Sequence, residues 1–270
     1  MDQSFGTNGI TFTDFENDTD YTRTLAIASD NSIWVLGTAT IDGSYNPVIV
    51  RYLENGVRDM NFGTNGVLTP NGFKIYSLLD DGILVAGNLF SNGNSSIVVH
   101  KYRLDGSLDK SFGDQGMITL DILSADEYFY ELFVNDDNGF KIVGASEANG
   151  FRSIVSARYS QNGTIDESYG NNGIAVSPYV QDEFIRLSEV KRFQDNSFLV
   201  TLLLKDNNLY LAKYLSDGAA DRTFGIDGIM ATAFQHTGPF AIATTTLPNN
   251  KILALMHRRG DVNPSDAETF

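Results

Sequence analysis

Short runs of apolar and β-branched residues, separated by Gly, Asn and Asp, make up most of the chain. The beginning of the chain shows the pattern, with four such runs at residues 10–15, 22–28, 32–39 and 47–53. Alternating apolar positions rich in Val, Ile and Thr predict strands, and the residues between them predict tight turns. No segment keeps an apolar stripe at helical spacing over three turns, so we expect an all-β protein with essentially no helix.

The four runs recur along the chain in step with a polar phrase. Asp-x-x-(Phe/Tyr)-Gly-x-x-Gly occurs five times, with its aspartate at positions 2, 59, 109, 166 and 221. A basic residue and a tyrosine precede the last four copies, as Arg51-Tyr52, Lys101-Tyr102, Arg158-Tyr159 and Lys213-Tyr214. Between each such pair and the next phrase stands Asn-Gly or Asp-Gly, the strongest short signal for a hairpin turn. A period of this length in a β-rich chain is typical of propeller blades, which must stack to bury their apolar faces.

The residues of the repeated phrase are expected to be structural. Its aspartate is suited to accept hydrogen bonds from the backbone two residues later, which fixes a turn. Its aromatic ring is predicted to fill the space between neighbouring blades, at Phe5, Phe62, Phe112, Tyr169 and Phe224. A ligand site rarely needs five identical rings, so a binding role for them is the weaker alternative.

These motifs resemble the bacterial delta-60 repeat family, whose repeats follow L-D-x-S-F-G-x-x-G with a downstream apolar strand ending in Gly and an R-Y-x-x-D-G. The segments LDKSFGDQG (108–116) and YRLDGSLD (102–109) match it closely. Leu202 and Met256 stand where the family strand has its Gly, so the last two units depart from the pattern. The resemblance covers nearly the whole chain and implies a β-propeller. It implies no catalytic mechanism and transfers no active-site residue.

The repeats predict a single domain over residues 1–270, a five-bladed propeller of four-stranded antiparallel blades. The fifth unit runs out near the place of its last strand, so the strand predicted at 10–15 is expected to complete that blade and close the ring through the two termini. The alternative is a fragment of a larger propeller.

Composition narrows the classes of partner. The chain has 34 acidic and 19 basic residues and a net charge of −15, which argues against nucleic acid and anionic membrane surfaces. It has no cysteine, which excludes disulfides and thiolate catalysis. No apolar run is long enough to span a membrane, and this chain contains no signal peptide, so a signal for secretion would lie upstream.

No catalytic residue is predicted from the sequence. The three histidines have no ligand spacing, and no nucleophile elbow, phosphate loop or dinucleotide motif occurs. The acidic run at residues 14–20 resembles an oxygen-rich calcium loop in outline, with candidate ligands Asp14, Glu16, Asp18 and Asp20. A solvated acidic loop is the default interpretation, and no other cofactor is expected.

Function is expected on the loops that vary between units, because binding residues concentrate on variable loops held by a rigid scaffold. The candidate ligand-binding residues there are Tyr21, Tyr45, Tyr128, Phe151, Arg152, Phe184 and Arg258. The first hypothesis is a non-enzymatic, monomeric propeller that binds a glycan or protein surface, as an extracellular or cell-surface adhesion module. The second is a five-bladed glycoside hydrolase, which would need a pair of loop carboxylates about 5–10 Å apart.

Overall fold

The computed structural model of the protein consists of β-strands joined by turns and loops. It describes residues 2–15, 19–79, 82–91, 93–122, 125–148, 150–177, 184–204, 208–235, 242–246 and 251–256. Every regular element in these segments is a strand, which confirms the all-β prediction. No helix in the described part of the chain has the length and apolar character that a membrane crossing requires.

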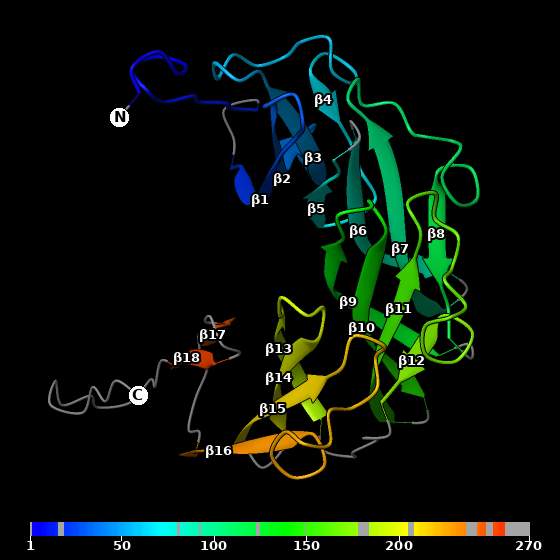
Figure 1. The fold of residues 1–270 in the computed structure, drawn as a ribbon. Helices are drawn as coiled ribbons and strands as arrows, with labels where there is room; N and C mark the ends of the chain where they lie inside the picture. The colour runs from blue at the N-terminus through cyan, green and yellow to red at the C-terminus, as the bar shows by residue number, and fades with distance from the viewer. Residues whose placement is uncertain are drawn as a thin grey trace, which may run out of the picture. The chain divides into compact units, whose positions relative to one another are not determined.

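The strands form one antiparallel sheet for each repeat unit (Figure 1). The first sheet contains β1 (Tyr21–Ile27), β2 (Ile33–Ile41), β3 (Ser44–Tyr52) and β4 (Val67–Leu68). The second contains β5 (Lys74–Ser77), β6 (Gly82–Ser91), β7 (Asn94–Arg103) and β8 (Met117–Leu120). The third contains β9 (Asp126–Val134), β10 (Phe140–Ala148), β11 (Phe151–Tyr159) and β12 (Ile174–Val176). The fourth contains β13 (Phe184–Arg192), β14 (Phe198–Leu204), β15 (Asn208–Tyr214) and β16 (Ile229–Gln235), and β17 (Ile242–Thr246) pairs with β18 (Ile252–Met256).

The chain falls into two compact units. The first comprises residues 1–141 and 159–165, and the second comprises residues 142–158 and 166–270. The expectation of one domain over the whole chain stays a prediction.

Each strand that follows a copy of the repeated phrase completes the sheet before it. Thus β4 follows the phrase at Asp59 and pairs with β3, and β16 follows the phrase at Asp221 and pairs with β15. The phrases at Asp59, Asp109, Asp166 and Asp221 therefore each lead into the last strand of the preceding sheet.

The prediction of a strand at residues 10–15 is wrong. Ile10 forms an isolated bridge with Thr7, and residues 11–14 have no regular structure. The equivalent strands β4, β8, β12 and β16 each pair with the strand that ends in the preceding basic residue and tyrosine. The described segment at residues 10–15 forms no ladder of this kind. Its pairing with the fifth unit, and with it the closed ring, stays a prediction.

The aromatic residue of the phrase packs between two blades, as predicted from the sequence. Phe62 is fully buried, with its ring edge-on to Trp34 of β2 at 4.6 Å between centroids. Its other side faces Gly106 in the turn after β7, where a Cβ atom would lie 2.8 Å from the ring. Only glycine fits this approach, and its φ of 84° suits the hairpin. The same contact joins Phe5 to Gly56, Phe112 to Gly163 and Tyr169 to Gly218.

A backbone hydrogen bond accompanies the ring contact in the first three copies. The N–H of the phrase glycine donates to the carbonyl of the residue before the turn glycine: Gly6 to Asn55 at 2.8 Å, Gly63 to Asp105 at 3.2 Å and Gly113 to Asn162 at 2.9 Å. We refer to the ring contact and this hydrogen bond together as the interblade latch. The aromatic ring is buried in the three middle copies, whereas Phe5 and Phe224 are half-buried.

The basic residue before each tyrosine forms an ion pair with the phrase aspartate that follows it. The nitrogen–oxygen distances are 2.7 Å for Arg51–Asp59, 3.9 Å for Lys101–Asp109, 2.7 Å for Arg158–Asp166 and 2.9 Å for Lys213–Asp221. The other carboxylate oxygen of the aspartate accepts the backbone N–H two residues later, as Asp221 does from Thr223 at 3.1 Å. The aspartate therefore fixes both the turn and the strand that leads into it.

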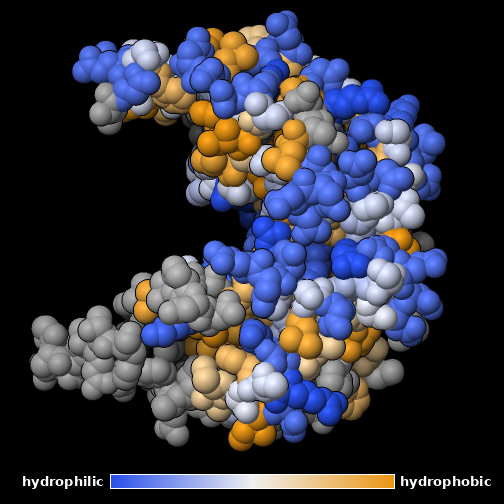
Figure 2. Space-filling model, in the orientation of Figure 1, coloured by the Kyte–Doolittle hydropathy of each residue, from blue (hydrophilic) through white to orange (hydrophobic). Residues whose placement is uncertain are grey.

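One face of β1 is open. Leu25 and Ile27 are exposed by 56% and 58%, and Figure 2 shows apolar side chains on this part of the first blade. Leu25 pairs with Val35, and the residues in the same register of later blades are Ile75 opposite Val85 and Val190 opposite Val200. Ile75 and Val190 are both 4% exposed. The first blade therefore presents an apolar face that the other blades bury.

Replacing Phe112 with alanine should destabilise the fold. Phe112 is 1% exposed, and its ring packs on Phe140 at 6.0 Å between centroids, so truncation leaves a cavity beside Gly163. We expect the free energy of unfolding to fall by about 3–5 kcal/mol, measured by urea denaturation. The same change at the half-buried Phe5 should cost clearly less, and equal losses at both positions would contradict burial of the ring as the source of the stability.

Stability should fall in acid, because the folded structure prefers the ionised phrase aspartates. The Thr223 hydroxyl and then Lys213 hold the pKa of Asp221 below its ordinary value of 3.8. A lowered folded-state pKa stabilises the fold above the unfolded-state value, and the gain is lost as the pH falls through the folded-state value. Asp221→Asn should cost about 1–2 kcal/mol at pH 7 and flatten the loss of stability below about pH 4. The control is Asp114→Asn, at an exposed position outside the four ion pairs named above.

The closed ring predicted from the sequence would cover the open face of β1. Leu25→Asp should then bury a charge and cost at least about 2 kcal/mol in the free energy of unfolding. The control is Ile226→Asp, at a residue that is 83% exposed in a turn. If both variants melt at the wild-type temperature, the face is open in solution and the ring is not closed over it.

Candidate functional site

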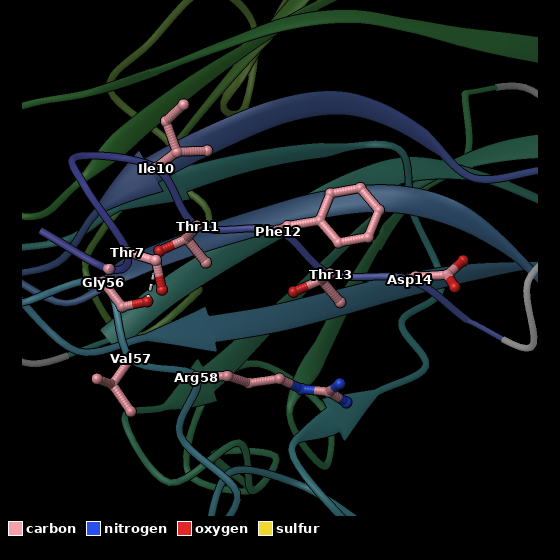
Figure 3. Close-up of a pocket in the computed structure, with 10 residues that line it drawn as sticks. Thr7, Ile10, Thr11, Phe12, Thr13, Asp14, Gly56, Val57 and Arg58 are labelled. Atoms are coloured by element: carbon pink, nitrogen blue, oxygen red, sulfur yellow. Dashed lines mark hydrogen bonds between the residues drawn. The ribbon is translucent and has the colours of Figure 1, made fainter.

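A pocket of about 580 Å³ lies in the first unit, between the segment after the first phrase and the turn before the second (Figure 3). Its lining residues are Gly6, Thr7, Ile10, Thr11, Phe12, Thr13, Asp14, Gly56, Val57 and Arg58. We call it the Arg58 pocket. The latch between Gly6 and Asn55 holds its two walls together at one end.

Two threonine hydroxyls fix the wall formed by residues 11–14. The Thr11 hydroxyl donates to the carbonyl of Gly56 at 2.6 Å, and the Thr13 hydroxyl shares a hydrogen bond with the Tyr52 hydroxyl at 2.5 Å. Thr11 and Thr13 thus tie an irregular segment to the first blade, although the segment has no strand ladder. Phe12 lies between them in the chain and is 86% exposed.

Arg58 supplies the positive charge of the pocket. Its guanidinium lies 5.3 Å from the centre of the Phe15 ring and donates one hydrogen bond, at 3.3 Å, to the carbonyl of Asn65. Its Nε is buried and has no hydrogen-bond partner among the described residues. In Figure 3 the side chain runs alongside the segment that carries Thr13 and Asp14.

The pocket contains one of the four predicted calcium ligands. Asp14 is exposed and lines the pocket. Asp20 is half-buried and accepts the backbone N–H of Phe15 at 2.9 Å. Glu16 and Asp18 lie outside the described residues. No cluster of three or more His, Cys, Asp or Glu suited to a metal occurs in the part of the chain that the structure describes, and the calcium site stays a prediction.

Two of the predicted loop aromatics lie at one end of the first blade. Tyr21 begins β1 and pairs with Thr38, while Tyr45 pairs with Thr40 across the β2–β3 hairpin. They are 59% and 66% exposed. Both residues therefore lie at the same end of the first sheet, in accessible positions.

The other predicted loop residues are distributed over later blades. Tyr128 is half-buried in β9. Phe151 begins β11 and is 42% exposed, and Arg152 beside it donates to Glu147 at 2.5 Å. Phe184 begins β13, with its side chain outside the described set, and Arg258 lies outside the described residues altogether. A binding role for these residues stays a prediction.

A second group of ionisable residues lies on the first strands of the second and third blades. The Glu131 carboxylate accepts hydrogen bonds from the Tyr76 hydroxyl and from Lys74, the latter at 2.8 Å. Burial and then the Glu131 charge raise the pKa of Tyr76. Leu132 also donates its N–H, at 3.0 Å, to the same carboxylate oxygen as Tyr76. Lys74 donates to the other oxygen, so Glu131 has protein donors on both oxygens. This group joins two blades and is better suited to a structural role than to catalysis.

Phe12 and Arg58 were not among the binding residues predicted from the sequence. A signal for Arg58 exists in the repeats, because the residue before the phrase aspartate is apolar in the other copies: Met1, Leu108, Ile165 and Ala220. Phe12 has no such signal, because its exposure follows from the missing strand ladder at residues 10–15.

Comparison with known proteins supports the architecture. A family model described as "Domain of unknown function (DUF5122) beta-propeller" matches residues 28–62 and 79–112. Among curated proteins, none matches the chain. One of the similar solved structures is prolyl oligopeptidase B from Galerina marginata, bound to a 35mer hydrolysis and macrocyclization substrate. It is 11% identical, with a TM-score of 0.35, over 83% of this chain and 37% of that one. The repeated four-stranded antiparallel sheets and the matching family model show that this chain is an all-β protein built from β-propeller blades.

Proposed function

We propose that the protein is a non-enzymatic, ligand-binding β-propeller and that the Arg58 pocket binds a glycan. The observation that carries this proposal is the exposed ring of Phe12 beside threonine hydroxyls, a carboxylate and a guanidinium in one pocket. A sugar ring has an apolar face and an edge of hydroxyl groups. An aromatic ring suits the face, and side chains with hydroxyl, carboxylate or guanidinium groups suit the hydroxyls.

The pocket favours binding over hydrolysis. Glycoside hydrolysis uses two carboxylates that flank the scissile bond. Asp14 is the one carboxylate among the residues that line the pocket, within the part of the chain that the structure describes. The five-bladed glycoside hydrolase remains the alternative, and release of reducing sugar when the protein is incubated with a glycan that it binds would favour it.

The rest of the binding surface follows from the same architecture. The exposed rings of Tyr21 and Tyr45 offer a second contact area on the first blade for a long glycan or a protein surface. An extracellular or cell-surface adhesion role, with the protein acting as a monomer, belongs to this proposal. The high negative charge favours neutral or locally complementary partners over nucleic acid.

A glycan array with purified protein tests the proposal, with and without calcium. We expect binding to a defined set of glycans, at least tenfold weaker in Phe12→Ala, since a few aromatic anchors usually dominate an interface. A double variant, Tyr21→Ala with Tyr45→Ala, tests the second contact area in the same assay.

The pattern of losses separates the surfaces. Loss in the Phe12 variant alone assigns binding to the Arg58 pocket, and loss in the tyrosine double variant alone assigns it to the hairpin end of the blade. Loss of wild-type binding on removing calcium would support the metal role of the acidic loop. Wild-type protein that binds no glycan under either condition would overturn the proposal.

A further inference from the structure

We infer that the glycan bound in the Arg58 pocket is acidic and that Arg58 binds its carboxylate. This inference rests on the proposed glycan-binding function and names its ligand class. Three observations support it: the position of Arg58 in the repeat, the lack of an ion pair between Arg58 and any carboxylate of the described residues, and the charges that line the pocket.

The repeat shows that Arg58 is not needed by the fold at its position. Arg58 lies over the last glycine of its phrase, where a Cβ atom on Gly66 would be 3.1 Å from the arginine Nε. In the next copy Leu108 occupies this place, and a Cβ atom on Gly116 would be 2.5 Å from its Cγ. An apolar side chain therefore fills the same space elsewhere in the chain. The scaffold gains nothing evident from a charge there.

Arg58 differs from the other arginine of the first blade in its partners. Arg51 forms ion pairs with both Asp30 and Asp59, so its charge is neutralised within the blade. Among the described residues, no carboxylate forms an ion pair with Arg58. Its guanidinium is positioned instead by the Phe15 ring and by one long hydrogen bond to a carbonyl. A guanidinium that forms no ion pair with the described carboxylates is suited to a ligand anion, although Asp14 lines the same pocket.

A carboxylate fits this pocket better than a phosphate monoester. The planar guanidinium fork matches the two oxygens of a carboxylate, and such paired bonds are among the stronger charge-assisted contacts. Asp14 lines the same pocket and would repel a group with two negative charges. A uronic or sialic acid carries one negative charge together with several hydroxyls. Its carboxylate can bind Arg58 while hydroxyl groups donate to Asp14.

Matched pairs of ligands test the inference directly. An array carries acidic oligosaccharides of the uronate and sialic types, each beside its methyl ester, which keeps the sugar hydroxyls and removes the charge. We expect wild-type protein to bind at least one acid form about tenfold or more tightly than its ester. The preference should weaken as salt is raised from 50 to 500 mM, because the added contact is ionic.

Arg58→Leu is the matched variant, since leucine is the residue that the next repeat carries in this place. It should keep the wild-type melting temperature and bind acid and ester equally. Arg58→Lys keeps the charge without the fork and should retain an intermediate preference. Phe12→Ala should weaken both forms by a similar factor.

The outcomes separate the inference from the proposed function. Wild-type protein that binds acid and ester equally, or binds neutral glycans alone, overturns the acidic-ligand inference and leaves glycan binding intact. A preference for acid that persists in a folded Arg58→Leu variant overturns the role of Arg58. Absence of binding to every glycan overturns the proposed function itself.

Discussion

The interblade latch is the constraint on which the rest of the structure depends. A blade of four strands cannot bury both of its faces alone, so each must be held against its neighbour in one register. The Phe62 ring packs between Trp34 and Gly106 and so holds two blades together. The N–H of the next residue, Gly63, donates a hydrogen bond to the carbonyl of Asp105. The contact requires the absence of a side chain at the turn glycine, which explains why the two motifs recur together at a fixed distance. The contact forms only where both the phrase aromatic residue and the turn glycine are present.

Electrostatics supports the latch from inside each blade. The basic residue before the tyrosine links the end of one strand to the phrase aspartate, and in the first blade Arg51 also reaches Asp30 in the turn between β1 and β2. Three segments of one blade thus meet at a single guanidinium. The Arg51–Asp59 pair is largely sheltered from solvent, so it is less screened by salt than a pair on an open surface.

Most strands, the turns and the role of the repeated aromatic residues could be predicted from the sequence, because each follows from a local pattern that recurs along the chain. The aromatic ring is fully buried in the three middle copies, whereas Phe5 and Phe224 are half-buried. The strand at residues 10–15 could not, because alternation shows that a segment is able to form a strand and says nothing about whether a partner lies beside it. The predicted loop aromatics Tyr21 and Tyr45 are accessible, as expected for binding residues. The pocket itself was missed, since it depends on Phe12, Thr13 and Arg58 converging from segments that are far apart in the sequence. Comparing the repeats position by position would have singled out Arg58.

The place of Arg58 in the repeat has a consequence for valency. The position before the phrase aspartate occurs in every unit and tolerates residues as different as Leu108 and Ala220, so a binding group can appear there without disturbing the latch. With one arginine among these positions, the chain would hold a polymeric ligand at one point. Under the proposed function, an arginine at a further copy would add a second binding group, and a polymer that reached both groups would gain avidity without any improvement of a single pocket. In such a repeated scaffold, substitutions that change binding strength fall at other positions than the residues that stabilise the fold.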